Sequence, residues 1–246
     1  MLIFDLEGTI AHFRRFYTNS SSLSYSFPPR TVLTGLIAAV LGHERDSYYE
    51  IFSSDNCKIS LAIKKPISKI IQTVNYIRTK NEKEVTGSGG HTQVPVEFVL
   101  PSEDILQYRV YFLHNDSKIV NKLYDTIITG NYYYPPYLGI SECPATLRCL
   151  DLTSDFELIS TSEGFEMCTI VPTETIESID FKAGYKFIKE DRVPVEFSTE
   201  RRITKVGAYI FEKNCKKIPN VKIKGELFIV SYTEGLNKVQ EYGVFL

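Results

Sequence analysis

The sequence predicts an α+β protein whose first part mixes helices with strands and whose second part consists almost wholly of strands. Two segments, 32–41 and 119–128, have apolar residues at helical spacing, and both lie in the first 144 residues. Beyond Pro144 the helical period disappears and short β-rich runs replace it. The 16 Tyr and 15 Phe among the 246 residues also favour strands, because aromatic side chains fit the pleated surface of a sheet.

The N-terminal elements are expected to be a strand, a polar loop and a helix. Apolar residues dominate 2–6, which we expect to be the strand, and the polar loop covers 14–26. Thr31 is a suitable N-cap for a helix over 32–41, and Gly42 is a suitable residue to end it.

The middle of the chain predicts four strands and a second helix. The strands are expected over 58–63, 70–78, 96–100 and 106–113. The polar segment 79–95 separates the second strand from the third, and its glycines indicate a long mobile loop or the tip of a hairpin. Asn115 or Asp116 is expected to cap the helix over 119–128, and Gly130 is expected to end it.

The order of these elements is that of a ferredoxin-like β-α-β-β-α-β unit with an inserted hairpin. We therefore expect a ferredoxin-like N-terminal domain over 1–144, followed by a smaller, mostly antiparallel β domain over 145–246. The strands of the second domain are expected over 156–159, 185–188, 206–211 and 226–232.

The composition indicates a cytoplasmic protein without a cofactor. The five cysteines are scattered and form no C-x-x-C pair, so we expect neither a zinc site nor a disulfide framework. This usage is typical of a reducing compartment. No secretory signal is expected, and the longest apolar run, near 36–41, is too short to span a membrane.

The small net charge of −2 conceals an uneven distribution of charge along the chain. The segment 182–224 holds 12 basic residues against 5 acidic ones, and 58–83 holds 7 basic residues against Glu82. The segment 142–180 reverses the balance, with 9 acidic residues against Arg148. Solvated faces often have such runs, but two basic segments can also form a phosphate-binding groove if the fold brings them together.

One short motif is similar to the first motif of haloacid-dehalogenase-type phosphatases. The segment FDLEGT at 4–9 would supply Asp5 as the nucleophile, with Glu7 in place of the second acid, around a magnesium ion. Such an enzyme also needs acidic residues at a later strand end, but the adjacent pair at 103–104 precedes a strand. The β-rich segment 145–246 further lacks the α/β alternation of that fold. A magnesium-dependent phosphatase therefore remains a remote alternative.

A basic-aromatic cluster at 14–17 is the strongest signal for binding. Paired arginines can bind phosphates while a neighbouring aromatic ring stacks on a base. Arg30 lies just before the expected N-terminus of the first helix, where free backbone N–H groups favour an anion. Among the four histidines, His91 in the Gly-rich segment is the one placed to meet a ligand.

Four stretches make the interpretation more specific. They read AHFRRFYT at 11–18, LSYSFPPRT at 23–31, GLIAAVLG at 35–42 and PPYLGISECP at 135–144. These stretches resemble the shared motifs of the CRISPR-associated "Cas five" family of the RAMP superfamily, and the type I-B branch is the most similar. The resemblance covers roughly the first half of the chain.

This resemblance implies a non-catalytic subunit of the Cascade surveillance complex, which acts in antiviral defence. Members of the family bind the 5′ handle of the CRISPR RNA and cap the filament of backbone subunits. They also contact the large subunit that reads the PAM, which relates them indirectly to target DNA. The inserted hairpin, called the thumb, would correspond to 79–95 here. The residues expected to contact RNA are Arg14, Arg15, Tyr17, Tyr25, Arg30, Arg78, Lys80, Gly89, His91, Gln93, Arg201 and Arg202.

One branch of the family implies an alternative function. Its members cut precursor CRISPR RNA without a metal, using a Tyr, a Lys and a His that follows the Lys. No Lys-His pair occurs here, because the residues before the four histidines are Ala11, Gly42, Gly90 and Leu113. A metal-independent endoribonuclease therefore remains the alternative to an RNA-binding subunit, and we expect no catalytic residue.

Overall fold

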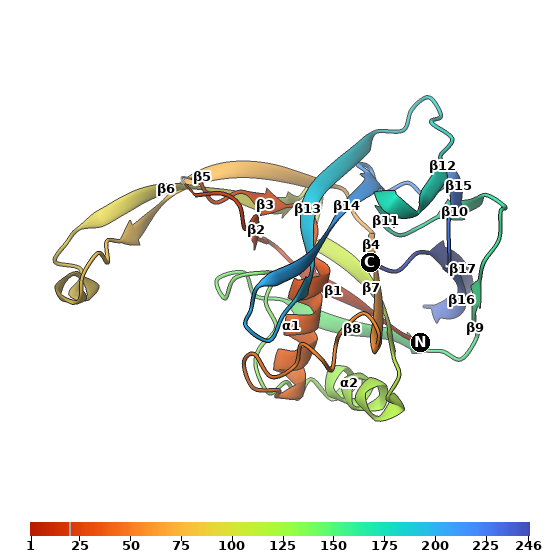
Figure 1. Ribbon diagram of the computed structural model, residues 1–246, viewed down its shortest axis with the longest axis horizontal. Helices are drawn as coiled ribbons and strands as arrows, with labels where there is room; N and C mark the ends of the chain where they lie inside the picture. The colour runs from red at the N-terminus through yellow and green to blue at the C-terminus, as the bar shows by residue number, and fades with distance from the viewer. Residues whose placement is uncertain (20) are drawn as a thin grey trace.

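Strand β1 (Leu2–Gly8) lies inside the sheet on which the first half of the chain is built (Figure 1). It pairs antiparallel with β7 (Leu106–His114) on one side and with β8 (Thr146–Leu152) on the other. β4 (Cys57–Ile63) pairs antiparallel with β7, which gives the sheet order β4-β7-β1-β8. The strand predicted over 2–6 is therefore confirmed.

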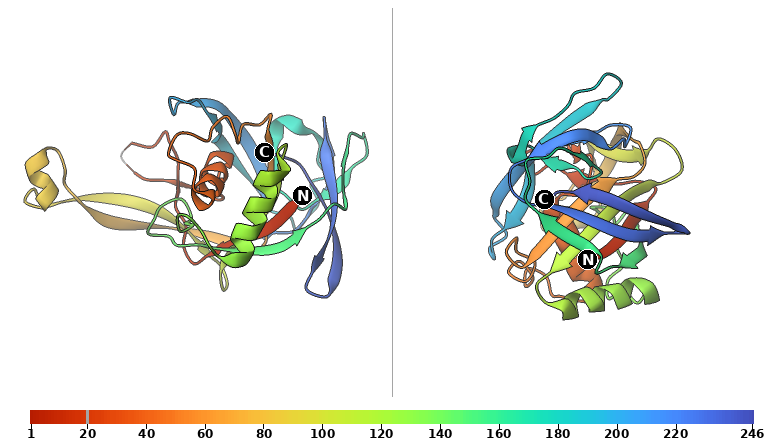
Figure 2. Two further views of the ribbon diagram at one scale, coloured as in Figure 1. Left: turned by 90° about the horizontal axis from the view of Figure 1, so that it is seen from below. Right: turned by 90° about the vertical axis from the view of Figure 1, so that its right-hand side faces the viewer.

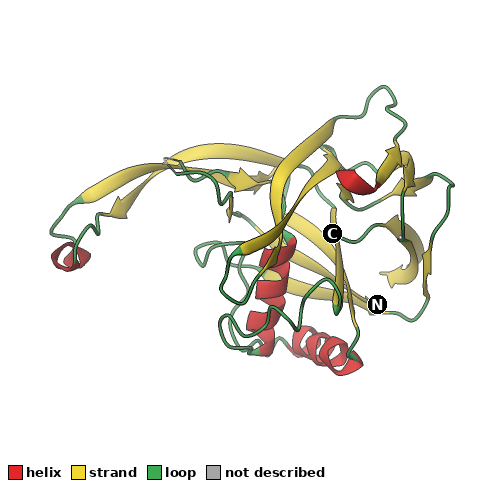
Figure 3. Ribbon diagram, in the orientation of Figure 1, coloured by secondary structure: helices red, strands yellow, loops and turns green. Residues whose placement is uncertain are grey.

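The computed structural model describes residues 1–19 and 21–246. Ser20, which falls in the predicted loop over 14–26, lies outside the described residues. The described chain has an α+β fold, mostly of strands, with two α-helices and several antiparallel sheets (Figure 3). Neither α-helix is long and apolar enough to cross a membrane.

The first helix, α1 (Arg30–Leu41), begins earlier than predicted. Its N-cap is Pro29, whose carbonyl accepts hydrogen bonds from the backbone N–H groups of Val32 and Leu33 at 2.9 and 3.1 Å. The prediction of Thr31 as the cap is therefore wrong, because that residue lies in the first turn. Gly42 ends the helix as predicted, with a φ of 81° that favours glycine.

The second helix, α2 (Ser117–Thr129), confirms the predicted caps. The Asp116 carboxylate accepts a hydrogen bond of 2.9 Å from the backbone N–H of Lys118. Gly130 ends the helix with a φ of 68°. Leu123 and Ile127 form the buried stripe of α2, and they join the core that also contains the inner face of α1.

The inserted hairpin is much larger than the segment predicted for it. β5 (Ile67–Ile77) and β6 (His91–Pro101) pair along their whole lengths, and a short 3-10 helix, η1 (Glu82–Thr86), forms the tip. The segment 79–95 is thus only the distal part. The hairpin projects away from the rest of the molecule in two views (Figures 1 and 2).

The C-terminal part is built almost wholly of strands, as predicted, but the runs predicted at 185–188 and 206–211 overlap longer strands, Phe187–Phe197 and Ile203–Glu212. A six-stranded sheet has the order β12-β15-β10-β17-β16-β9, and its pairings are antiparallel except for the parallel contact of β10 with β17. In chain order its strands are β9 (Phe156–Ile159), β10 (Phe165–Met167), β12 (Ile176–Ser178), β15 (Ile218–Ile223), β16 (Leu227–Glu234) and β17 (Asn237–Gly243).

Two smaller sheets complete the fold. The first has the order β11-β14-β13 and consists of β11 (Val171–Pro172), β13 (Phe187–Phe197) and β14 (Ile203–Glu212). A short 3-10 helix, η2 (Thr173–Thr175), follows β11. The second is the two-stranded pair of β2 (Phe13–Arg14) and β3 (Ser24–Tyr25). Val193 and Val195 of β13 belong to the same buried core as α1.

The four-stranded sheet is covered on both faces, which explains why β1 reads as an almost continuous apolar run. Leu2, Phe4 and Leu6 face the core formed with the helices. Ile3 faces a second core, to which Phe228 of β16 belongs. β8 lies beyond the predicted boundary at residue 144, so this sheet includes one strand of the predicted C-terminal domain.

A buried ion cluster lies between the two large sheets. The Arg109 guanidinium, which is 0% exposed, donates from Nε to Asp5 Oδ1 at 2.8 Å and from Nη2 to Glu234 Oε1 at 2.6 Å. Asp5 also accepts from Arg148 Nη2 and Gln107 Nε2, each at 2.7 Å. Burial alone would lower the pKa of Arg109, but its bonds to Glu234 and Asp5 outweigh burial and raise that pKa.

The ion cluster overturns the phosphatase alternative. A nucleophilic carboxylate must reach its substrate, but Asp5 is fully buried and its oxygens are bound to two arginines and a glutamine. Within residues 1–19 and 21–246, no group of His, Cys, Asp or Glu side chains is arranged to hold a metal ion. Asp5 therefore holds the buried Arg109, which itself reaches Glu234 of the second large sheet, and does not act as a nucleophile.

We expect the substitution Asp5→Asn to lower the free energy of unfolding by about 3 kcal/mol, because it leaves the buried Arg109 with a single carboxylate partner. Glu7→Gln is the matched control. Glu7 binds Arg148 at the edge of the same cluster, and its substitution should cost less than about 1 kcal/mol. Urea unfolding of both variants measures the difference, and equal effects would contradict the structural role of Asp5.

Candidate nucleic-acid interface

Three segments meet at the base of the β5–β6 hairpin: the loop from β2 to β3, strand β6 and strand β13. Backbone hydrogen bonds join Ala11 to Val99 in both directions, at 2.9 and 2.8 Å. The buried ring of His12 adds a side-chain link, since Nδ1 donates to the Glu97 carbonyl at 2.8 Å and Nε2 lies 2.8 Å from Ser22 Oγ. The hairpin is therefore anchored on the loop that contains the predicted basic-aromatic cluster.

Arg15 is committed to an internal ion pair in this region. Its Nη2 donates to Glu190 Oε2 of β13 at 2.6 Å, and Glu190 is 3% exposed. Lys69 Nζ lies 3.4 Å from the second oxygen of Glu190, and Ser26 Oγ donates to that oxygen at 2.6 Å. These contacts position the loop, and they leave Arg15 half-buried with its charge already neutralised.

The exposed cations of this region are Arg14 and Arg192. The Arg192 guanidinium lies over two rings of the loop, 4.4 Å from the centroid of Tyr17 and 5.5 Å from that of Phe16. Arg14, Phe16 and Arg192 are exposed, whereas Tyr17 is half-buried. Together these four residues form what we call the loop surface.

Sequence reasoning missed Arg192. This residue interrupts β13 with a φ of 56°, and the register of β13 against β14 shifts there. A positive φ at a non-glycine residue changes the direction of its side chain. This change allows the side chain of Arg192 to contact the loop between β2 and β3. Nothing in the local sequence marks this bulge, so only the packed structure brings Arg192 to Tyr17.

Two predicted contact residues prove to be structural. Tyr25 is 0% exposed, and its hydroxyl donates to the Arg192 carbonyl at 2.5 Å, so its ring has no free face for a base. Arg30 is 3% exposed, and its Nη2 donates to the carbonyls of Phe52 and Cys57 at 2.9 and 2.8 Å. Both predictions are therefore wrong, because each polar group is used inside the fold.

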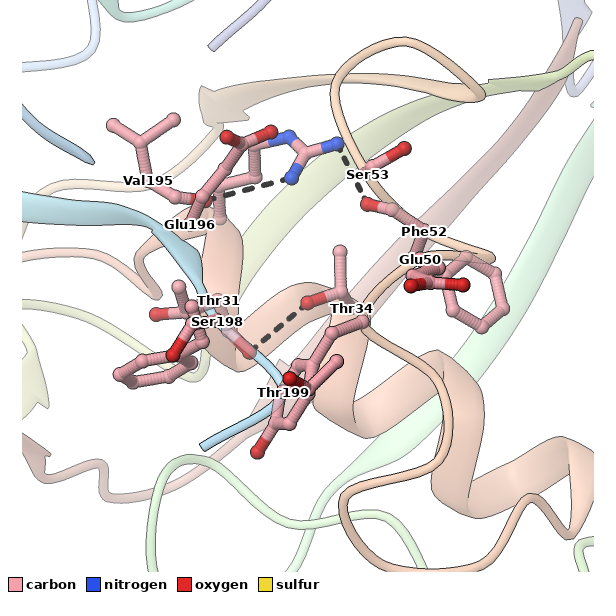
Figure 4. Close-up of a pocket in the computed structure, with 12 residues that line it drawn as sticks. Thr31, Thr34, Glu50, Phe52, Ser53, Val195, Glu196, Ser198 and Thr199 are labelled. Carbon is pink, nitrogen blue, oxygen red and sulfur yellow. Dashed lines mark hydrogen bonds between the residues drawn. The ribbon is translucent and has the colours of Figure 1, made fainter. Parts of the chain in front are cut away.

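A cavity of about 250 Å³ lies beside the first turn of α1 (Figure 4). The side chains that line it include the hydroxyls of Thr31, Thr34, Ser53, Ser198 and Thr199 and the carboxylates of Glu50 and Glu196. Ser54, whose backbone N–H donates to Glu196 Oε1 at 2.8 Å, lowers the pKa of Glu196 and so favours the ionised carboxylate. The Arg30 guanidinium also lines the cavity, as one cation against two carboxylates. The net negative charge disfavours a phosphate here, although the position next to a helix N-terminus would favour one.

Arg201 and Arg202 lie in the turn that follows the cavity-lining residues Ser198 and Thr199. Both arginines are exposed, and Arg202 Nη2 lies 3.1 Å from Glu200 Oε2. They belong to a different part of the surface from the loop surface. Their turn follows the end of β13, whereas Arg192 of the loop surface lies in the middle of that strand.

The remaining predicted residues gather at the far end of the hairpin. Arg78 Nε lies 3.7 Å from Glu84 Oε2, and the same oxygen accepts 2.8 Å from the backbone N–H of Lys80. A Cβ on Gly89 would lie 2.8 Å from Cγ of Glu84, so a glycine is needed for this close approach. Two further predicted residues, His91 and Gln93, are exposed near the start of β6.

The comparisons with known proteins agree with this architecture. The family described as CRISPR-associated protein (Cas_Cas5) matches residues 1–206. A chain of a "CRISPR RNA-guided surveillance complex" is 14% identical, with a TM-score of 0.55 over 89% of this chain and 90% of that chain. A CRISPR protein from Archaeoglobus fulgidus is 13% identical, with a TM-score of 0.49 over 98% and 99%. No curated protein matches the sequence. At 14% identity the first structure shows a shared fold alone.

We expect the free energy of unfolding to decrease as the pH is lowered below about 6.5, because burial lowers the pKa of His12 below its usual 6.5. The unfolded chain then binds a proton that the folded chain does not, which costs up to about 1.4 kcal/mol per pH unit for one group. His12→Gln should remove much of this slope between pH 6.5 and 5. His43, whose pKa burial also lowers, should retain a part of it. An unchanged slope in urea titrations of the variant would contradict this role.

We also expect Arg30→Met to lower the free energy of unfolding by about 2–4 kcal/mol, because it leaves buried carbonyls without a donor. Arg14→Met, at an exposed position of the same loop-to-helix segment, should change it by less than about 0.5 kcal/mol. Denaturant melts of the two variants provide the comparison. If Arg30→Met were as stable as Arg14→Met, the buried hydrogen bonds would not matter to the fold.

Proposed function

This chain belongs to the CRISPR-associated Cas5 family, since the family match covers residues 1–206, and on that premise we propose that it is a non-catalytic subunit of a type I Cascade complex. In this role it binds the 5′ handle of the CRISPR RNA and caps one end of the filament of backbone subunits. The motifs at 11–42 and 135–144, which resemble the type I-B branch, support that subtype.

The arrangement of the first sheet supports a ferredoxin-like domain within this proposal. The elements follow the order β1, α1, β4, β7, α2 and β8, and the sheet order is β4-β7-β1-β8. If the four strands are numbered 1 to 4 in chain order, their order across the sheet is 2-3-1-4. All three pairings between neighbouring strands are antiparallel. The β5–β6 hairpin is the insertion, placed between the second and third strands. Because β8 belongs to the unit, the proposed division of the chain moves from the predicted residue 144 to a point after Leu152.

The observation that carries the proposal is the loop surface at the base of the hairpin. Arg14 and Arg192 are exposed cations, and Phe16 presents an exposed ring beside Arg192. Single-stranded RNA is held by such pairs, because guanidinium groups bind phosphates while rings stack on bases. Arg192 replaces the buried Arg30 as the second phosphate-binding cation of the proposed handle site.

The hairpin is proposed to act as the thumb beside the RNA. Arg78, Lys80, Gly89, His91 and Gln93 lie in its distal part, within reach of RNA that passes the tip. The hairpin also exposes five large apolar side chains: Ile70, Ile71, Tyr76, Ile77 and Val85. Exposed apolar groups of this number indicate a partner surface, and a backbone subunit is the proposed partner. The large PAM-reading subunit is proposed to bind elsewhere on the chain.

The same structure gives the ribonuclease alternative little support. The ring of His12 is used to anchor the hairpin, and that of His114 binds the Ile51 carbonyl at 2.9 Å. His43 packs against Phe52. His91 is exposed, but the residue before it is a glycine and not the lysine of the cutting branch.

We expect the double substitution of Arg14→Gln and Arg192→Gln to weaken binding of a labelled 5′-handle RNA at least tenfold at about 100 mM salt. The plot of log affinity against log salt should become shallower by about 1.4, which corresponds to two phosphate contacts on single-stranded RNA. Fluorescence anisotropy across a salt series measures both quantities. Glutamine removes the charge at each position and keeps most of the side chain.

The matched control removes the same net charge elsewhere, through Arg45→Gln and Lys238→Gln, two exposed positions away from the loop surface. Equal losses in the two double variants would show that only net charge matters and would refute the site. Labelled repeat RNA incubated with the wild-type protein in EDTA should stay intact. A cut under those conditions would instead assign the ribonuclease activity.

A further inference from the structure

Five exposed lysines gather where the β12–β13 connection meets the β14–β15 turn. They are Lys182, Lys186, Lys213, Lys216 and Lys217. Phe187 pairs with Glu212, and the backbone N–H of Lys213 donates to the Lys186 carbonyl at 2.8 Å. The register therefore places Lys186 opposite Lys213, so two like charges face each other across the strand pair. We call the five residues the lysine cluster.

A buried carboxylate holds the two lysine segments together. Glu212 is 3% exposed and accepts hydrogen bonds from the backbone N–H groups of Lys186 at 2.9 Å, Asn214 at 2.8 Å and Lys216 at 3.0 Å. These donors belong to the β12–β13 connection and to the β14–β15 turn. The Glu212 carboxylate thus holds the backbone that carries the lysines. It is buried beneath the surface on which the ammonium groups are exposed.

The charge of the lysine cluster is largely unneutralised. Among the side chains that the structure describes, one lysine of the cluster forms an ion pair: Lys182 Nζ lies 3.9 Å from Asp180 Oδ2, and both side chains are exposed. Lys216 Nζ donates to the Gly184 carbonyl at 3.1 Å and lies 5.2 Å from the Tyr185 ring centroid. Like charges placed together destabilise a fold. A bound anion would offset that cost.

An exposed aromatic ring lies beside the lysine cluster. Phe181 is 69% exposed and packs edge to face on Phe187, with ring centroids 5.2 Å apart and an interplanar angle of 90°. Tyr185 lies nearly parallel to Phe187 at 6.1 Å. Phe181 therefore presents a supported ring to solvent. Such a ring among cations is the arrangement that binds an unpaired base and its flanking phosphates.

We propose that the lysine cluster and Phe181 bind a single-stranded nucleic acid other than the guide handle. Lysines supply point charges for backbone phosphates, and Phe181 stacks on one unpaired base. The lysine cluster lies at the N-terminal end of β13, whereas Arg192 of the loop surface lies in the middle of that strand. The exposed ion pair of Lys189 with Asp191, at 2.7 Å, lies between them and offers no free cation to a continuous phosphate chain. Figure 1 places the β12–β13 connection on the side of the molecule away from the hairpin tip.

The probes are fluorescent 20-mers without a handle sequence, made as single-stranded DNA, as RNA of the same sequence and as duplex DNA. The cluster variant replaces four lysines by glutamine, at Lys182, Lys186, Lys213 and Lys217. The control variant removes the same net charge at Lys58, Lys65, Lys118 and Lys238. Lys216 is kept, because its hydrogen bond to the Gly184 carbonyl holds the connection.

We expect the cluster variant to bind the single-stranded probes at least tenfold more weakly than wild type at about 50 mM salt. Its log–log salt slope should be shallower by about 2 to 3, and the control variant should keep the wild-type slope. Phe181→Ala should weaken binding of single strands at least about fivefold, with duplex binding unchanged. The melting temperature of the cluster variant should equal or exceed that of wild type, because the repulsion of Lys186 and Lys213 is removed.

The relative affinity for DNA and RNA identifies the natural strand, and a preference for either supports the proposal. Four results would overturn it: the cluster variant binds as wild type does, duplex DNA binds tighter than both single strands, polyglutamate competes as well as the single strands, or saturating handle RNA displaces the probe. The proposal does not depend on the handle site. Loss of handle binding in the Arg14 and Arg192 double variant, with probe binding intact, would separate the two surfaces.

Discussion

The buried guanidinium of Arg109 is the constraint on which the packing of the two large sheets depends. A charge removed from water needs hydrogen-bonded partners of opposite sign, and Arg109 finds Asp5 in its own sheet and Glu234 in the C-terminal sheet. Tyr232 extends the cluster to Glu241, which Lys64 neutralises at 2.9 Å. Apolar contacts are not directional, whereas the hydrogen bonds of this cluster require each donor to face its acceptor. This cluster specifies one arrangement of the two sheets.

The same requirement for buried partners decides which arginines remain available to a ligand. Arg30 donates to backbone carbonyls and Arg15 to the buried Glu190, so both hold the N-terminal segment against β13 and the loop before β4. The internal hydrogen bonds of Arg15 and Arg30 position the loop between β2 and β3. Arg14 and Arg192 remain exposed on the surface of the protein. The exposed cations are thus displayed on a rigid base.

Membership of the Cas5 family and the arrangement of these surfaces together support the proposal of a subunit that holds RNA and meets partner subunits. Strand β13 supplies Arg192 to the loop surface, and the lysine cluster lies at the N-terminal end of the same strand, whereas the hairpin is a separate element. A protein with separate surfaces of this kind can hold one strand while it guides another. Each function then depends on exposed side chains placed by a buried framework.

Local apolar spacing and backbone preference were enough to predict the two helices and their glycine ends, the early strands and the β-rich second half. The family motifs also lie within short stretches of chain. Packing between distant segments is what starts the hairpin at Ile67, adds β8 to the first sheet and buries Tyr25 and Arg30. It also brought Arg192 to Tyr17 and Lys186 opposite Lys213. Burial and strand pairing join residues that are far apart in the chain. The residues next to a charged side chain therefore do not show whether it forms an ion pair inside the fold.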